Sequence, residues 1–252
     1  MTGCGTMRSG RAWGDDAIYP IARKSIHLAA RNALLDPITW LPLVGAGVIA
    51  AGDWDQDISD WATEHTPLFG SESGARTYSD ISRAFLQAEA FATTLMTPSG
   101  EDPAQWALAK GKGALVGITA LGVTTRITSD LKGMIGRERP DHLDNRSMPS
   151  GHASSAFGAM QLANRNLDYI DMSRSGRTGL QAANVALAAS VAWARLEGER
   201  HFPTDVMVGA ALGNFTTRLI YETLIGTTPN DKFSVYVEPS LSGGKVFLAW
   251  QF

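Results

Sequence analysis

The chain has 252 residues, of which 44% are hydrophobic and 19% are charged, and its formal net charge is −3. This length and balance are typical of one globular domain with a sizeable core, and the slightly acidic charge argues against a nucleic-acid partner. The longest uncharged runs, residues 37–52 and 179–194, are shorter than the roughly 20 apolar residues that a membrane-spanning helix needs. We therefore expect both runs to form buried core helices, with contact to a bilayer surface as the alternative.

The chain begins Met1-Thr2-Gly3-Cys4, and Cys4 is its single cysteine, so an internal disulfide is excluded. A small residue before a cysteine is typical of the end of a bacterial lipoprotein signal, although the charged and apolar regions of a signal peptide do not precede it here. One interpretation is that Cys4 carries a lipid, which would place the protein in the bacterial periplasm or cell envelope, at a membrane surface. The other is an exposed cysteine on a flexible tail.

Residues 1–20 have no periodicity, and we expect a flexible N-terminal segment there. Asp36-Pro37 and Asp102-Pro103 each place an N-cap carboxylate before a proline at the first helical position. Glycines 111, 113, 117 and 122 weaken the helix that follows Asp102, so we expect neighbouring helices to approach it closely there. Helical spacing of apolar residues predicts helices over residues 21–35, 37–52, 53–65, 75–96, 103–132, 153–163, 179–195 and 203–224.

The C-terminal residues have a different pattern. Apolar residues alternate with others over 233–237 and again over 246–250, on either side of Ser242-Gly243-Gly244. This alternation around a turn predicts a β-hairpin. The sequence therefore indicates a flexible segment over residues 1–20, an all-α domain over 21–228 and a C-terminal β-hairpin tail over 229–252.

His201 and Asp205 lie four residues apart at the start of the last predicted helix. That spacing places both side chains on one face, where the carboxylate can hydrogen-bond one ring nitrogen of His201 and increase the nucleophilicity of the other. The alternative is that Asp205 serves only the helix dipole.

Pro149-Ser150-Gly151-His152 precedes another predicted helix. Ser150 suits the N-cap position and Gly151 lets the backbone approach a ligand, so the N–H groups of this helix start can bind an anion. His152 would lie beside that anion, where a histidine can act as general acid for a leaving oxygen. The alternative is a capped helix with an exposed histidine.

Three cations stand close to these stretches in the sequence: Lys132, Arg139 and Arg195. A phosphate and its transition state need several fixed positive charges, which arginine supplies as a two-pronged contact and lysine as a point charge. Solvated surface charge is the alternative, but Arg195 closes a largely uncharged run, where a cation needs a partner or a route to the surface.

The combined pattern resembles the type 2 phosphatidic acid phosphatase superfamily. The family motif is Lys, six residues, Arg-Pro; then Pro-Ser-Gly-His; then Ser-Arg, five residues, His, three residues, Asp. The order and every gap are kept in this chain, at Lys132, Arg139-Pro140, Pro149 to His152, Arg195, His201 and Asp205. Ala194 departs from the motif, because the family has serine there, and we expect a lower rate or an altered substrate preference from the missing hydroxyl.

The resemblance implies a helical bundle of the phosphatidic acid phosphatase and haloperoxidase type. It also implies a metal-independent phosphatase that acts on a phosphomonoester or a pyrophosphate, free or lipid-borne. By the family's roles, His201 attacks phosphorus and becomes phosphohistidine, Asp205 orients it, and His152 protonates the leaving group and then activates water. The phosphate oxygens would be bound by Lys132, Arg139, Ser150, the Gly151 N–H and Arg195.

No metal cofactor is expected, because side-chain cations stand where a metal would, and vanadate should inhibit. The candidate substrates are a phospholipid, a polyprenyl pyrophosphate, a lipid A phosphate and a soluble ester.

A vanadium-dependent haloperoxidase is the first alternative function, since that class resembles the same family and would hold vanadate through His201. The short loop between Arg139 and Pro149 favours the phosphatase. A non-catalytic phosphate- or lipid-binding lipoprotein is the second. Arg137, His142 and Arg146 flank the same loop, and we expect them to be mostly solvated. The alternatives are that His142 reaches the pocket and that Arg137 or Arg146 helps to bind a pyrophosphate or an acidic head group.

Overall fold

The protein is described here by a computed structural model, which covers residues 5–7, 12–15, 17–18 and 26–226 and the backbone of 233–238 and 245–250. These residues form eight helices and two strands. The helices are α1 (Ile26–Leu35), α2 (Pro37–Ala51), α3 (Asp55–His65), α4 (Glu72–Met96), α5 (Pro103–Ile135), α6 (Gly151–Leu167), α7 (Arg174–Glu197) and α8 (Pro203–Leu224). The strands are β1 (Phe233–Glu238) and β2 (Lys245–Trp250). The predicted all-α fold class is confirmed.

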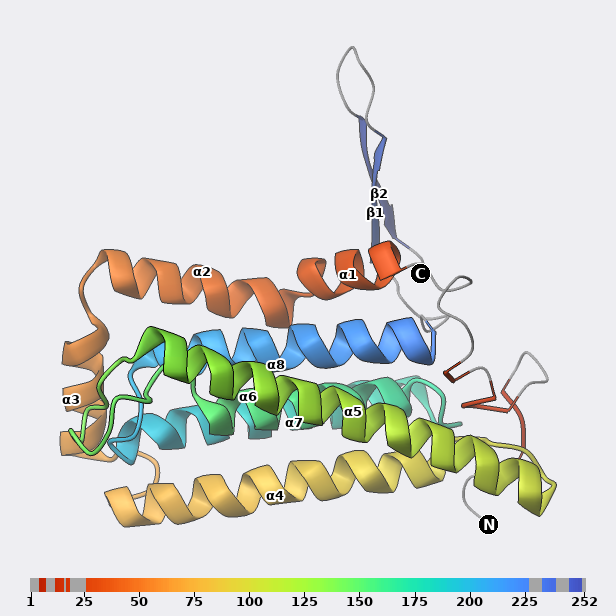
Figure 1. The fold of residues 1–252 in the computed structure, drawn as a ribbon, viewed down its shortest axis with the longest axis horizontal. Coiled ribbons are helices and arrows are strands. Elements are labelled where there is room, and N and C mark those ends of the chain that lie inside the picture. The colour runs from red at the N-terminus through yellow and green to blue at the C-terminus, as the bar shows by residue number, and fades with distance from the viewer. Residues whose placement is uncertain are drawn as a thin grey trace.

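The long helices lie side by side as a bundle, and α3 lies across one end of it (Figure 1). At that end α5 and α7 finish and α6 and α8 begin, so four helix termini and their loops are brought together there (Figure 1). Helix α6 is the centre of the bundle, because it packs against α4, α5, α7 and α8. The predicted site residues belong to these termini.

Local sequence signals fix where several helices start. The Asp36 carboxylate accepts a hydrogen bond from the backbone N–H of Ile38 at the start of α2, and Asp102 accepts one from Gln105 at the start of α5. Each of these caps satisfies an N–H that the first helical turn leaves without a partner. Ser71 and Ser173 act in the same way at α4 and α7, which start earlier than the apolar periodicity predicted.

Glycine allows α6 and α8 to approach each other closely. A Cβ atom on Gly213 would lie 2.1 Å from the backbone oxygen of Ser154, and one on Gly209 would lie 2.6 Å from that of Ser150. The expectation for α5 holds at Gly117, where a Cβ would lie 2.9 Å from Leu162 of α6. At Gly113 a Cβ would instead overlap the ring of Trp13, which lies outside the helices.

Part of the segment predicted to be flexible is packed into the bundle. The side chain of Trp13 is 1% exposed, and its indole N–H donates to the Tyr221 hydroxyl at 3.1 Å. For Trp13 the prediction of flexibility is wrong, because its ring fills the space that Gly113 leaves open on α5. Cys4 lies outside the described residues, and its lipidation stays a prediction.

Helix α2 is not the buried core helix that its uncharged sequence predicted. It buries Thr39 and Ala46 but exposes large apolar side chains, including Leu41 at 53% and Val44 at 56%. The reason is geometric: α2 packs mainly against α8 and its neighbour α1, and much of the rest of its surface is exposed. Among the described residues, no single helix is long and apolar enough to cross a membrane. Helices α1 and α2 reach that length and hydropathy only as a pair, which is bent by 51°.

The backbone of β1 and β2 forms the predicted hairpin. The two strands pair antiparallel, with Phe233 opposite Trp250 and Glu238 opposite Lys245. The boundaries chosen for the tail, 229–252, stay a prediction.

Candidate active site

The structure brings all eight predicted site residues to the end of the bundle that α3 covers. Lys132 lies in the last turn of α5, and Arg139 follows in the loop. Ser150, Gly151 and His152 form the start of α6. Arg195 lies in the last turn of α7, and His201 and Asp205 flank the start of α8. His201 precedes α8 rather than sharing a helical face with Asp205, because the helix begins at Pro203.

His201 is enclosed by the protein and faces an arginine. Its side chain is 2% exposed, and Nε2 lies 3.4 Å from Nη1 of Arg139. A guanidinium can only donate hydrogen bonds, so this contact requires a lone pair on Nε2 and places the ring proton on Nδ1. Nδ1 lies 3.7 Å from Oδ2 of Asp205, slightly beyond hydrogen-bond distance.

The imidazole of His201 is neutral over the ordinary pH range. Burial lowers its pKa to about 3, and although Asp205 favours the charged ring, the nearby Lys132 and Arg195 oppose it. A buried neutral imidazole with its Nε2 lone pair toward a cationic pocket is a nucleophile for an electrophilic phosphorus.

Asp205 is held by a network that the sequence did not indicate. Its side chain is fully buried; Oδ2 accepts from the Ser147 hydroxyl at 2.5 Å and the Phe202 N–H at 2.9 Å, and Oδ1 accepts from Arg137 Nη1 at 2.9 Å. Burial acts to raise the pKa of Asp205, but His201, Ser147 and Arg137 together keep it below the usual range. The carboxylate is therefore fixed in its charged form.

Arg137 ties this network to α3. Its Nη2 donates to Asp55 at 2.7 Å, and its guanidinium lies 4.1 Å from the ring centre of Phe202. Asp55 also accepts from the N–H and the hydroxyl of Thr204. The expectation that Arg137 is solvated is wrong: it joins two carboxylates, Asp55 from outside the motifs and Asp205 from within them.

Lys132 and Arg139 place positive charge beside His201. Lys132 Nζ donates to the backbone oxygens of Arg146 and Ser147, which fixes the ammonium under the loop. Burial, and then the charge of Arg139, lower the pKa of Lys132 to about 8. Arg139 is held by Asp144 at 2.7 Å and by the backbone oxygen of Arg200 at 3.0 Å.

Arg195 is a buried cation with an unused donor. Its residue is 6% exposed, Nη1 donates to the Ser79 hydroxyl at 2.8 Å, and Nε has no partner among the described residues. Burial lowers its pKa to about 10, so it stays charged at neutral pH. A buried charged donor without an acceptor is costly, and an oxyanion at this point would satisfy it.

His152 is paired with a residue that the sequence did not single out. Nε2 lies 2.6 Å from Oδ1 of Asp80 on α4. Burial and the charge of Arg195 lower the pKa of His152 to about 4, against the opposing effect of Asp80. The hydrogen bond from His152 lowers the pKa of Asp80, which is accordingly ionised.

The start of α6 is anchored to α8. Ser150 is fully buried, and its N–H donates to the backbone oxygen of Asp205 at 2.9 Å, while its hydroxyl accepts from the Ala153 N–H. A Cβ on Gly151 would lie 3.8 Å from Cε of Lys132, so the helix N-terminus and the ammonium are neighbours. Helix N–H groups and a lysine at one point form an anion site.

The remaining candidates of the loop lie away from this cluster. The His142 side chain is 78% exposed and pairs with Glu138, and the Arg146 guanidinium bonds to Ser129. Within the described ranges no group of three or more His, Cys, Asp or Glu side chains has the arrangement of a metal site.

A family model described as the PAP2 superfamily matches residues 113–226, which include all eight predicted site residues. This matched stretch, just under half of the chain, is similar to the PAP2 superfamily. The chain is also similar in fold to a solved structure described as the first transmembrane PAP2 type phosphatidylglycerolphosphate phosphatase from Bacillus subtilis. The two share 20% identity with a TM-score of 0.53, over 73% of this chain and 92% of that one. No curated protein sequence matches the chain significantly.

The match to the PAP2 superfamily accounts for the motif residues but not for the residues that hold them. Asp55 and Asp80 lie before the matched stretch, and the only sequence signal for them is a carboxylate near the start of a predicted amphipathic helix. Ala194, where the motif has serine, is fully buried beside Arg195.

Proposed function

We propose that this protein is a phosphatase that transfers a phosphoryl group to His201 and then to water, without a metal. The observation that carries the proposal is the neutral, buried His201, whose Nε2 lone pair faces the Arg139 guanidinium. The unpartnered Nε of Arg195 supports it, because an anion bound there would meet a donor already in place.

In the first step, Nε2 of His201 attacks phosphorus and the bond from phosphorus to the leaving oxygen breaks. His152 gives its proton to that oxygen, and the Nδ1 proton of the phosphorylated ring faces the Asp205 carboxylate. In the second step, neutral His152 accepts a proton from water, the water oxygen attacks phosphorus, and the phosphorus–nitrogen bond breaks. Phosphate leaves and both histidines return to their starting protonation states.

The cations would bind the three non-bridging oxygens. Arg139, Arg195 and Lys132 supply positive charge, and the Ser150 hydroxyl and the Gly151 N–H at the start of α6 complete the site. Lys132 uses two of its three ammonium protons on backbone oxygens and keeps the third for phosphate. Bound phosphate would raise the pKa of Lys132 from about 8 and hold it charged.

A lipid-borne substrate at a membrane of the cell envelope is the narrower proposal. Its support is the exposed apolar surface of α2, together with the name of the similar Bacillus subtilis protein. A periplasmic location and an anchor at Cys4 belong to the same proposal.

The test is phosphate release from p-nitrophenyl phosphate and from a polyprenyl diphosphate, in EDTA, with and without vanadate. We expect vanadate-sensitive release in EDTA, an acid-labile phosphoenzyme after rapid quenching, and loss of both in His201→Ala. Full activity of His201→Ala would overturn the mechanism. No release from either substrate, with bromide oxidation once vanadate is added, would instead identify a haloperoxidase. The ratio of the two release rates tests the lipid preference.

A further inference from the structure

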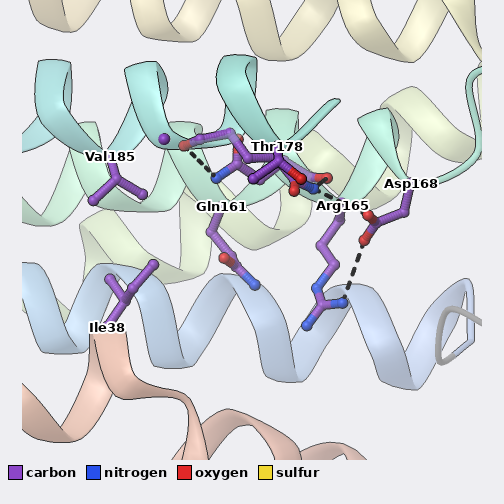
Figure 2. A pocket seen from close by; sticks show the side chains of 9 residues that line it. Ile38, Gln161, Arg165, Asp168, Thr178 and Val185 are labelled. Carbon is purple, nitrogen blue, oxygen red and sulfur yellow. Dashed lines mark hydrogen bonds and ion pairs between the residues drawn. The ribbon is translucent and has the colours of Figure 1, made fainter. Parts of the chain in front are cut away.

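A cavity lies between α6 and α7, and Ile38 of α2 also lines it (Figure 2). Its volume is about 390 Å³, within the roughly 300–1,000 Å³ of small-molecule sites. It lies at the end of α6 away from the catalytic residues: His152 and Arg165 are separated by about 20 Å at about 1.5 Å per residue along the helix. The cavity is therefore distinct from the candidate active site.

The cavity has an unpaired amide in its wall. Gln161 is 4% exposed, and its carboxamide makes no hydrogen bond to any residue that the structure describes. Figure 2 shows this side chain extending from α6 alongside that of Arg165. Neither polar atom of this amide is among the buried side-chain atoms that lack a partner, so the amide opens onto the cavity. One donor and one acceptor are thus presented together to whatever occupies the cavity.

The charges around the cavity favour a neutral occupant. Arg165 Nη1 lies 3.5 Å from Oδ2 of Asp168, and its Nη2 lies 3.1 Å from the buried Glu222. Asp168 also accepts from Gln181 Nε2 at 3.0 Å. Of these charged residues only Arg165 and Asp168 line the cavity, and because they neutralise each other the lining offers an added ion no excess of opposite charge.

Part of the lining is aliphatic. Ile38, Ala182 and Val185 line it, and the exposed Thr178 adds a hydroxyl at the rim. A ligand that fits must therefore present hydroxyl groups to the amide and C–H groups to the aliphatic wall. A sugar or cyclic polyol has both.

We propose that this cavity is a binding site for an uncharged sugar or polyol, with Gln161 as its principal hydrogen-bonding residue. The ligand is either a free sugar or the head group of an uncharged glycolipid. The proposal is independent of the phosphatase mechanism.

The test uses the full chain and ligand-observed NMR with free glucose, N-acetylglucosamine and myo-inositol. A parallel arm measures co-sedimentation with phosphatidylcholine vesicles that contain or lack a monoglucosyl diacylglycerol. Gln161→Ala removes the amide, and Val185→Trp fills the cavity from its aliphatic wall. Val123→Trp places the same ring on α5, where Val123 is 37% exposed and outside the cavity. Circular dichroism confirms that each variant is folded.

We expect at least one uncharged sugar or the glycolipid vesicle to bind, with affinity about tenfold lower in Gln161→Ala and unchanged in Val123→Trp. Binding should be lost in Val185→Trp; if that variant does not fold, Gln161→Ala alone decides. Binding of a free sugar would identify a free sugar as the ligand, and binding only to glycolipid vesicles would identify a lipid head group. No binding in either arm, or binding that Gln161→Ala leaves unchanged, would overturn the proposal. Binding of inorganic phosphate at this cavity would overturn the assignment of a neutral ligand.

Discussion

The Nε2 atom of His152 lies 2.6 Å from Oδ1 of Asp80, a carboxylate 72 positions earlier in the chain. The pair joins α6 to α4 beside Arg195. Asp80 favours the protonated form of His152, whereas burial and Arg195 disfavour it. Asp80 is thus a positioning residue that keeps the proposed general acid able to carry its proton.

Asp80→Asn should slow hydrolysis of alkyl phosphates roughly tenfold, part of the ~10²–10⁴ that general acid catalysis contributes. Hydrolysis of p-nitrophenyl phosphate should change much less, because its acidic phenol leaves without a proton. The measurement is kcat for both substrates. Asp130→Asn is the matched control, since Asp130 makes only an exposed pair with Arg126. An equal loss with both substrates would show that Asp80 has only a structural role.

The pH dependence should follow His152. Because its pKa is about 4, the free enzyme loses its acid form as the pH rises above that value, while His201 stays neutral above about 3. We expect kcat/KM for an alkyl phosphate to fall with rising pH. A bound phosphate dianion stabilises the imidazolium of His152, so kcat should fall at a higher pH than kcat/KM does. A kcat/KM that does not change between about pH 4 and about pH 8 would remove His152 from the mechanism.

Protonation of His201 should make the fold sensitive to acid. The folded pKa of about 3 lies below the ordinary histidine pKa of 6.5, so the unfolded chain takes up the proton first and stability falls as the pH decreases below 6.5. Between pH 7 and pH 5, protonation linked to His201 should lower the free energy of unfolding by on the order of 2 kcal/mol. Urea denaturation at both pH values measures it. His201→Asn should show a smaller loss, and an equal loss would contradict the buried neutral histidine.

Arg137→Gln should weaken both the fold and the site. Asp205 and Asp55 would each lose a charged donor, and the free energy of unfolding should fall by about 1–3 kcal/mol. Arg137→Lys should restore little, because one ammonium cannot reproduce the separate contacts from Nη1 and Nη2. Chemical denaturation and kcat measure the two effects. Arg126→Gln is the control, since the Arg126 side chain is 79% exposed.

Gly213→Ala should destabilise the protein by about 1–3 kcal/mol, because its Cβ would lie 2.1 Å from a backbone oxygen of α6. Gly122→Ala is the matched change in α5, where the new Cβ meets nothing within 4 Å. It should stabilise the protein by up to about 1 kcal/mol through helix propensity alone. Thermal unfolding of the two variants measures the difference, and opposite signs are expected.

The sequence by itself determined the helices and the chemistry-bearing residues. Cap signals such as Asp36-Pro37 act within a few residues, so they are readable without a fold. The motif that resembles the PAP2 superfamily was readable in the same way, because it rests on short spacings in the sequence. Its residues are Lys132, Arg139, His152, Arg195, His201 and Asp205.

Only the tertiary structure decided which side chains hold the reactive ones. Asp80, Asp55 and Arg137 resemble ordinary surface charges in the sequence, and they meet His152 and Asp205 because α4, α3 and the loop after α5 converge on one end of the bundle. The same is true of burial: α2 has an uncharged sequence but only one side against other helices, whereas Trp13 lies in an unpatterned segment and is enclosed. Periodicity reports which residues share a face, but which neighbour covers that face depends on contacts between distant parts of the chain.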